Sequence, residues 1–364
     1  MPEVWFPYGG VETLVTVQAE NLGALVEPVA EKSSGETERL AELLRGPVSL
    51  FVCDANPTTL ELLRDLVELT QADPPRVVAS GPKKSETSVP ELKGKVVYLP
   101  RNVASEADPP EPVPMLKEAG RKVFIGTARP DPLFGIIDAK VAVALGWVKG
   151  AMREASSARK DFEPTPFEKT ESFGTAVEIA GAIREATFLT AIPRGGRVRS
   201  VLEDAPFDAI RNGFLETALP AAKGMIVGAG GKGNDDTFSA ALRSVWGVIG
   251  GVKKSGDVLL LSECSEGVGS PALEMLASGR ISGEWRRREK YVVGLEEIYY
   301  LSKLKEEYSV LLLSGLPETF TRSKLGITSA RGSAEAVGRL LNKLGRNAKV
   351  NLITRATECR MQSA

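Results

Sequence analysis

The residues that could do chemistry in this chain are lysines, arginines and carboxylates, because the 364-residue sequence contains no histidine. Histidine is the usual general base near neutral pH and the commonest metal ligand. The three cysteines, Cys53, Cys264 and Cys359, are far apart and form neither a metal-ligand spacing nor a disulfide framework. Any catalysis is therefore expected to use Lys, Arg, Asp, Glu, Tyr or Cys side chains, or a cofactor.

Two lysines are candidates for catalytic work. Lys140 lies in an apolar helix start over residues 136–145, and desolvation turns a lysine into a candidate base or Schiff-base nucleophile. The alternative is a lysine whose stem packs on apolar neighbours while its ammonium reaches water. Lys83 follows a predicted strand end, where it would bind an anion or lie in a solvated loop. Asp131 is the carboxylate expected to share proton transfer with these lysines.

A glycine-rich loop over residues 228–233 joins a predicted strand to a predicted helix. Its backbone N–H groups and the helix dipole could cradle a phosphate or a carboxylate, with Gly230, Gly231 and Lys232 as contacts. The spacing matches neither a Walker loop nor the dinucleotide fingerprint. Asp235, at the start of the helix, would repel an anion there, and its alternative role is to cap the helix.

A second loop of this kind follows the aliphatic run 257–261, which is typical of a buried strand in a parallel sheet. Glu266 and Gly267 lie in this loop, and ligands of open α/β sheets bind at such carboxyl ends of strands. The alternative is that the glycines only make the turn. Asp54, at the end of an earlier predicted strand, would hold a hydroxyl, a ribose or a metal, or make an Asx turn.

The overall composition excludes several classes of partner. A net charge of −1 and a hydrophobic content of 43% give no electrostatic footprint for a nucleic acid or an anionic membrane. No apolar run approaches the roughly 20 residues of a membrane span, and the first residues lack a signal-peptide pattern. We therefore expect a cytoplasmic protein. Oligomerisation stays open, with the basic run 286–288 as a candidate subunit contact.

Short apolar runs alternate with amphipathic segments, which predicts an α/β protein with largely parallel sheets. Strand-loop-helix sets occur in both halves, so we expect two Rossmann-like α/β domains, residues 1–205 and 206–364, with a cleft between them. Residues 21–31 and 207–219 are predicted as helices, and residues 149–172 as a charged connection. The predicted strands are 3–8, 13–17, 48–53, 76–79, 96–99, 122–126, 186–192, 225–227, 257–261, 310–313 and 349–353.

Taken in order, these loops resemble one known family. The segments are Cys53-Asp54-Ala55-Asn56-Pro57-Thr58, Ala79-Ser80-Gly81-Pro82-Lys83, Gly135 to Lys140, Gly230-Gly231 with its helix, and Glu263 to Gly269. Their order and spacing are similar to those of the nickel-dependent lactate racemase family, over residues 45–353. The likeness is firmest over residues 225–270 and loosest over residues 85–185.

The resemblance implies a two-domain α/β protein whose site lies in the cleft. Family members tether a nickel-pincer nucleotide to a lysine and use histidines as metal ligand and as acid/base groups. Lys140 matches the tethering lysine, and Asp54 matches an aspartate that helps hold the ligand. Pro57 stands where the family has a ligand-holding arginine, and Lys83 and Asp131 stand where it has catalytic histidines.

The remaining matches lie in the second half and in the metal-ligand segment. Lys232, Asp235 and Arg243 fall in the loop and helix that close over the substrate in the family. The nickel-ligand histidine belongs in residues 154–158, where no residue of this chain can replace it. Because the metal ligand and both acid/base histidines are missing together, we expect no nickel-pincer mechanism and no metal site.

The sequence therefore predicts a divergent lactate-racemase-like protein that binds a small anion, such as a hydroxy acid, or a nucleotide in the interdomain cleft, with its cofactor unknown. In one form of this hypothesis it is an isomerase-like enzyme with proton transfer through Lys140, or through Lys83 with Asp131. In another it is a non-catalytic binding or regulatory protein. A nickel-pincer racemase or epimerase of a 2-hydroxy acid and a nicotinamide-dependent oxidoreductase are further alternatives.

Overall fold

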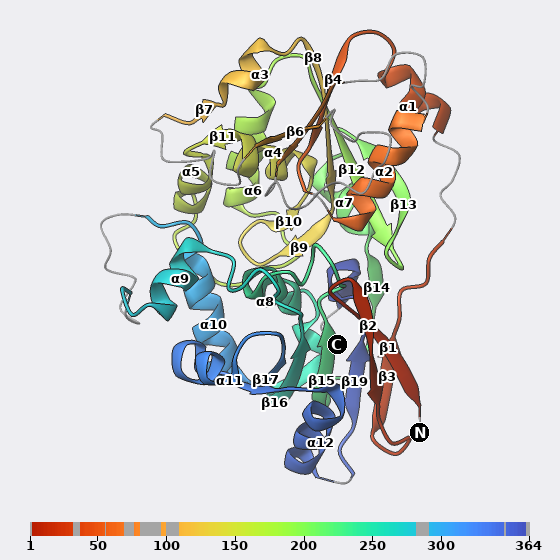
Figure 1. The fold of residues 1–364 in the computed structure, drawn as a ribbon, viewed down its shortest axis with the longest axis vertical. Helices are drawn as coiled ribbons and strands as arrows, with labels where there is room; N and C mark the ends of the chain where they lie inside the picture. Colours follow the sequence, from red (N-terminus) through yellow and green to blue (C-terminus); the bar gives the residue numbers. More distant parts are fainter. Residues whose placement is uncertain are drawn as a thin grey trace.

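The computed structural model describes residues 2–31, 37–54, 56–68, 76–80, 96–99, 109–281, 291–345 and 347–361. Within them the chain forms two α/β halves, each built on one six-stranded sheet with helices against it. Figure 1 shows the halves one above the other, with the N-terminal strands in the same half as the C-terminal ones. The predicted α/β class with largely parallel sheets is confirmed.

The sheet of the first half has the order β13-β12-β8-β4-β5-β6 and is parallel except for the β12–β13 hairpin. Its central strands are continuous apolar runs because both faces are covered. Its strands are β4 (Val48–Val52), β5 (Arg76–Ser80), β6 (Val96–Leu99), β8 (Arg121–Thr127), β12 (Ala186–Arg194) and β13 (Arg197–Glu203).

Two helical layers cover this sheet. On one face α1 (Thr37–Leu43) and α2 (Pro57–Glu68) pack on Leu50 and Ile125. On the other face Phe51 and Phe124 stack with ring centroids 4.9 Å apart and pack against α4 (Ala139–Trp147) and its neighbours. The other elements of this half are α3 (Pro114–Glu118), α5 (Ala151–Ser157), α6 (Glu171–Gly181), α7 (Phe207–Gly213) and the short strands β7 (Glu111–Pro112), β9 (Arg129–Asp131), β10 (Gly135–Ile137) and β11 (Val148–Lys149).

The sheet of the second half is parallel throughout, in the order β18-β17-β16-β15-β19-β3. Its strands are β3 (Leu22–Val26), β15 (Ala222–Gly228), β16 (Val252–Leu261), β17 (Ser309–Leu313), β18 (Thr328–Ala330) and β19 (Val350–Ile353). The aliphatic run predicted as a buried strand at 257–261 forms the carboxyl-terminal half of β16, the third strand from one edge.

Helices and an N-terminal hairpin cover the second sheet. The hairpin of β1 (Glu3–Tyr8) and β2 (Val11–Thr16) packs with α12 (Ser333–Leu344) on one face. On the other face lie α8 (Phe238–Trp246) and α10 (Leu295–Glu307). The remaining elements are α9 (Pro271–Ala277), α11 (Glu318–Phe320), β14 (Leu215–Thr217) and β20 (Cys359–Met361), the last two paired with each other.

One continuous apolar cluster joins the two halves. It runs from Phe124 on the first sheet through Trp147 to Leu242 and Leu260 of the second half. The division into domains at residues 205 and 206 stays a prediction, although β3 shows that sheet membership does not follow sequence order. Across the described residues, no helix combines the length and the apolar character that a bilayer crossing needs.

Three predicted segments have a different structure. Residues 21–31 are not helical, because β3 pairs with β19 and the side chain of Asn351 accepts a hydrogen bond from Ala24 N. The predicted helix 207–219 ends at Gly213, since the chain then turns into β14 to pair with β20. The predicted connection 149–172 contains α5 and the start of α6.

Candidate functional site: a cleft between the two sheets

A cleft of about 440 Å³ lies between the two halves, at the carboxyl ends of strands from both sheets. Strand β8 ends at Thr127 and strand β15 ends at Gly228, immediately before residues that line the cleft. Such a meeting of carboxyl ends is where open α/β sheets bind ligands. The lining residues are Pro7, Gly9–Glu12, Pro57, Thr58, Thr127, Ala128, Pro193, Gly195–Arg197, Gly230–Lys232, Asn234, Arg355, Thr357 and Glu358.

Three Gly-Gly pairs from distant parts of the chain line the cleft: 9–10, 195–196 and 230–231. Gly196 has φ +77°, and a Cβ there would come within 2.8 Å of the Arg355 guanidinium. Gly231 has φ +79°, and a Cβ there would meet Pro7 at 2.9 Å. Only glycine satisfies both the left-handed backbone and the close approach, so the cleft is lined by backbone at these turns.

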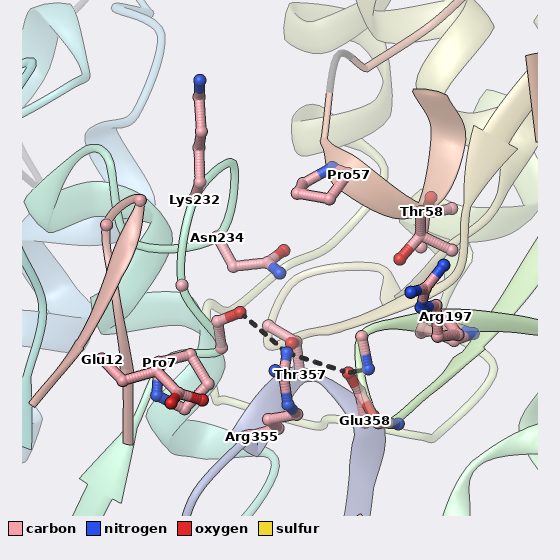
Figure 2. Close-up of a pocket in the computed structure, with 18 of the residues that line it drawn as sticks. Pro7, Glu12, Pro57, Thr58, Arg197, Lys232, Asn234, Arg355, Thr357 and Glu358 are labelled. Atoms are coloured by element: carbon pink, nitrogen blue, oxygen red, sulfur yellow. Dashed lines mark hydrogen bonds and ion pairs between the residues drawn. The ribbon is translucent and has the colours of Figure 1, made fainter. Parts of the chain in front are cut away.

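The charged floor of the cleft is an arginine–glutamate pair after β19. The guanidinium of Arg355 lies 3.7 Å from Glu358 Oε1 and donates to the carbonyl of Gly230 (Figure 2). The carboxylate of Glu358 also accepts hydrogen bonds from Gly195 N and Gly196 N, at 2.5 and 2.9 Å. Burial raises the pKa of Glu358, although the neighbouring guanidinium and the glycine N–H groups oppose the shift. The two glycine donors are therefore already occupied by an internal carboxylate.

No side chain among the described residues forms an ion pair with the ammonium of Lys232. Lys232 is exposed, and Figure 2 shows its side chain extending upward from the glycine-rich loop, away from Arg355. Across the opening lie Pro57 and Thr58, in the first turn of α2. That helix is capped by Asn56, whose Oδ1 accepts from Thr59 N at 2.9 Å. The N-terminus of α2 thus adds positive potential to the side of the cleft that faces Lys232.

Four of the predicted binding residues lie in or under this cleft. Gly230, Gly231 and Lys232 line it, as expected for the glycine-rich loop. Asp235 is fully buried beneath them, and its Oδ2 accepts a hydrogen bond from Gly9 N at 2.8 Å. Burial raises the pKa of Asp235 to about 6. Its carboxylate fixes the tip of the N-terminal hairpin against the loop, and the helix cap is instead Thr237.

Asp54 does not line the cleft but lies behind one of its walls. It accepts hydrogen bonds from Thr59 Oγ1 and from Thr127 N, and Arg129 lies 3.8 Å away. Burial raises the pKa of Asp54, and Arg129 opposes the shift. Since Thr127 lines the cleft, Asp54 is placed to position this wall, and its predicted contact with a ligand stays a prediction.

Asp131 and Arg243, predicted for different roles, bind each other. Asp131 is fully buried on β9, and Arg243 lies on α8 with Nη1 2.5 Å from Asp131 Oδ2. Neither residue lines the cleft. The other oxygen of Asp131 accepts from Leu133 N and Phe134 N, at 2.8 and 3.0 Å. The pair joins the first half of the chain to the second.

The remaining predicted residues lie apart from the cleft. Lys140 is on α4 with its ammonium 3.3 Å from Asp204 Oδ1 and 5.8 Å from the ring centre of Phe188. Its side chain is one-fifth exposed, which matches a lysine that packs its stem and pairs its ammonium at the surface. Glu266 is exposed, and Gly267, with φ +86°, makes a turn whose carbonyl accepts from Phe238 N. The predicted residue Lys83 lies outside the described residues.

The cysteines are poor nucleophiles where the structure places them. Cys264 is almost fully buried, and burial raises its pKa to about 12. The pKa of the Cys53 thiol is raised well above its usual range, again mainly by burial. A thiolate is the reactive form, so both side chains act as small apolar groups.

Sequence reasoning missed Arg355, Thr357 and Glu358, which form the floor of the cleft, and the hairpin tip with Glu12. The floor carried a usable signal, because Arg355 lies two residues after the last predicted strand. The hairpin tip carried none, since Gly9 reaches the cleft only by packing against a loop more than 200 residues away.

Comparison with solved structures identifies the fold. The chain matches the lactate racemase apoprotein of Thermoanaerobacterium thermosaccharolyticum with a TM-score of 0.72 and 12% identity, covering 99% of this chain and 100% of that one. A crystal structure of a Thermotoga maritima protein from the Northeast Structural Genomics Consortium matches with a TM-score of 0.63 and 10% identity, covering 93% and 100%. The protein therefore has a lactate-racemase-like fold.

No protein-family profile and no curated protein sequence matches the chain. The evidence for kinship is therefore the fold alone, at an identity too low to transfer an activity. This is consistent with a resemblance that depends on the order of loops rather than on a diagnostic motif.

The nickel-pincer nucleotide that this resemblance implies does not fit the residues present. The matching lysine, Lys140, pairs with Asp204 and does not line the cleft. The chain has no histidine to complete a metal sphere. Within the ranges that the structure describes, no three His, Cys, Asp or Glu side chains come together in a way that would hold a metal ion.

Proposed function

We propose that the protein binds a small organic anion, such as a 2-hydroxy acid, in the cleft between its two sheets, without a nickel-pincer mechanism. The observation that carries this proposal is the ammonium of Lys232 on a glycine-lined cleft, where no side chain among the described residues pairs with it. The guanidinium of Arg355 and the N-terminus of α2 line the same cleft. Glu12 and Glu358 also line the cleft, and Glu358 pairs with Arg355. The ammonium of Lys232 and the N-terminus of α2 are therefore the groups that favour an anionic ligand.

A carboxylate is the group that suits this arrangement. Arg recognises carboxylates through planar, often bidentate hydrogen bonds. Because Arg355 lies 3.7 Å from Glu358, a ligand carboxylate would have to share this guanidinium with the Glu358 side chain. The Lys232 ammonium is a compact charge on a flexible stem, which suits closure over the bound group. Thr58 lines the cleft and offers its hydroxyl to the hydroxyl group of a hydroxy acid. The hydroxyls of Thr127 and Thr357 already donate to Asn56 Oδ1 and to the carbonyl of Ala229.

The size of the cleft leaves room for a larger ligand. A volume of about 440 Å³ lies within the roughly 300–1,000 Å³ that is usual for small-molecule sites. A nucleotide is therefore the second ligand class, with its phosphate at the glycine-rich loop. The similarity to a lactate racemase apoprotein favours the hydroxy acid, since that is the substrate its name gives.

Titration calorimetry with D-lactate, L-lactate, a longer 2-hydroxy acid and AMP tests the proposal. We expect one of these to bind, and Lys232→Ala to weaken its binding about tenfold, as the loss of a charged hydrogen bond of about 1.5 kcal/mol would do. Lys254→Ala is the matched control, an exposed lysine near the amino-terminal end of β16, and should leave binding unchanged. Absence of binding by any probe, or equal effects of the two substitutions, would contradict the proposal.

A separate measurement distinguishes an enzyme from a binding protein. Proton NMR in deuterated water detects exchange at the carbon that carries the hydroxyl of a bound 2-hydroxy acid. Loss of that signal with time shows that the protein moves a proton at this carbon. A persistent signal with intact binding excludes proton exchange with solvent at this carbon and so favours the non-catalytic form of the same proposal.

A further inference from the structure

Away from the cleft, one arginine is surrounded by three buried carboxylates. Arg243 on α8 lies 2.5 Å from Asp131 Oδ2, 2.7 Å from Glu296 Oε1 and 2.7 Å from Glu297 Oε1. The two glutamates are in the first turn of α10. All three carboxylates are at most 2% exposed. Ser239 Oγ also donates to Glu297 Oε1, at 2.6 Å.

The charges of this Arg243 cluster do not balance when every acid is ionised. One guanidinium faces three carboxylates, which leaves a net charge of −2 in a buried site, and an uncompensated buried charge is costly. A bound proton lowers that cost. Glu296 is the acid that holds it, because burial, followed by the charges of Glu297 and Asp131, raises its pKa to about 7 against the opposing effect of Arg243.

The neighbouring titratable groups do not supply the missing positive charge. Tyr291 Oη bonds to Glu296 Oε2 at 3.1 Å and to Ser156 Oγ at 3.1 Å. Burial raises the pKa of Tyr291 and of Tyr300 well above the usual range, so both phenols stay neutral. Arg159 is the other cation that faces the cluster, near Tyr300, and it is paired with Asp161.

The cluster fastens the two halves to each other. Asp131 on β9 and Ser156 on α5 belong to the first half, and Arg243 and Glu296 belong to the second. Strand β9 begins at Arg129, directly after Thr127 and Ala128, which line the cleft. Movement of β9 would therefore move a wall of the cleft.

We infer that the Arg243 cluster is a proton-linked clamp that regulates the cleft, an inference that rests on the proposed function. The docked form of β9 holds a proton on the cluster, and the undocked form, with its carboxylates in water, releases it. Raising the pH from about 5 to about 7 therefore favours undocking by up to tenfold per pH unit, with no further change above that range. Ligand binding at the cleft weakens over the same range.

The clamp is tested first without any ligand. Hydrogen exchange of β9 and of the first turn of α10, corrected for the intrinsic exchange rate, is followed between pH 5 and pH 8. We expect the opening equilibrium to rise about tenfold per pH unit up to pH 7 and then to level. Glu296→Gln, which mimics the protonated acid, should abolish the dependence, and Glu306→Gln, at an exposed position of the same helix, should keep it. An opening equilibrium that does not change with pH in the wild-type protein overturns the clamp.

A second readout covers the case in which the Gln variant does not fold. In wild-type protein labelled with carbon-13 at the glutamate carboxyls, one resonance should titrate near pH 7. The ordinary glutamate pKa is about 4.3, so a threshold of about pH 5.5 separates a shifted glutamate from an ordinary one. If every glutamate titrates below that threshold, the clamp is overturned.

Binding of lactate then separates the clamp from the proposed function. If both hold, lactate affinity falls between pH 5 and 7 in the wild type and not in Glu296→Gln. Lactate that fails to bind while the exchange of β9 follows the expected pH dependence overturns the choice of ligand and leaves the proton-linked docking in place. Lactate affinity that is independent of pH overturns the regulatory role.

Discussion

The cleft and the Arg243 cluster both lie between the two halves, yet they use charge in opposite ways. In the cleft, the ammonium of Lys232 is exposed and unpaired by the described residues, and the walls are glycine backbone. In the cluster, Arg243 is 17% exposed and has three carboxylate partners, each at most 2% exposed. A cation with no internal partner is available to a ligand, whereas a cation surrounded by buried carboxylates holds the protein together.

This contrast assigns the predicted residues to two groups. Lys232 with its glycine-rich loop belongs to the cleft, and Asp131 and Arg243 belong to the Arg243 cluster. Asp235 shares a feature with each group, because its carboxylate is buried but accepts a hydrogen bond from Gly9 N in the hairpin tip that lines the cleft. A charged residue at the carboxyl edge of a sheet is therefore a binding candidate only when its partner is not already inside the protein.

The largest effect is expected from removing the positive charge of the Arg243 cluster. Arg243→Met should lower the free energy of unfolding by about 3–5 kcal/mol, because three buried carboxylates lose the guanidinium that contacts all of them. Urea denaturation at pH 7 measures it, with the exposed Arg322→Met as the control. A loss below about 1 kcal/mol, the range of an exposed pair, would show that the three carboxylates do not depend on Arg243 and would remove the contrast.

A smaller effect is expected from the backbone wall of the cleft. Gly196→Ala should cost about 1–2 kcal/mol of stability for the left-handed backbone at φ +77°, and should weaken ligand binding because the new methyl pushes on Arg355. The control is Gly174→Ala within α6, where a methyl meets nothing within 4 Å and should be neutral or stabilising. Thermal unfolding and titration calorimetry of both variants measure this. Unchanged binding by Gly196→Ala would remove Arg355 from the site.

Most of the fold could be predicted from the sequence because its signals are local. Buried strands such as 257–261 are continuous aliphatic runs, and the loops that follow them carry glycine or proline. The exceptions depend on distant partners. Residues 22–26 become a strand only because β19 offers a free edge and Asn351 a hydrogen-bond acceptor for the backbone of Ala24, and no local pattern contains that information.

The site could be predicted only in part, for the same reason. A glycine-rich loop after a strand is a local signal, and it led to Gly230, Gly231 and Lys232. The same reasoning applied to the last strand would have found Arg355. The pairing of Asp131 with Arg243 joins residues 112 positions apart, so the sequence shows two candidate charges and not that each satisfies the other.

The smallest effect is expected at Lys140, which belongs neither to the cleft nor to the Arg243 cluster and is paired with Asp204 at the surface. Lys140→Ala should change the free energy of unfolding by less than about 1 kcal/mol, because its pair with Asp204 is partly exposed. Ligand affinity and any turnover should be unchanged, since Lys140 does not line the cleft. Denaturation and calorimetry measure these effects. Mass spectrometry of the wild-type protein and of its peptide that contains Lys140 is the third measurement, and we expect both masses to match the sequence. A mass excess on that peptide would instead mean that this lysine carries a covalently attached group, and the nickel-pincer mechanism would have to be considered again despite the missing histidines.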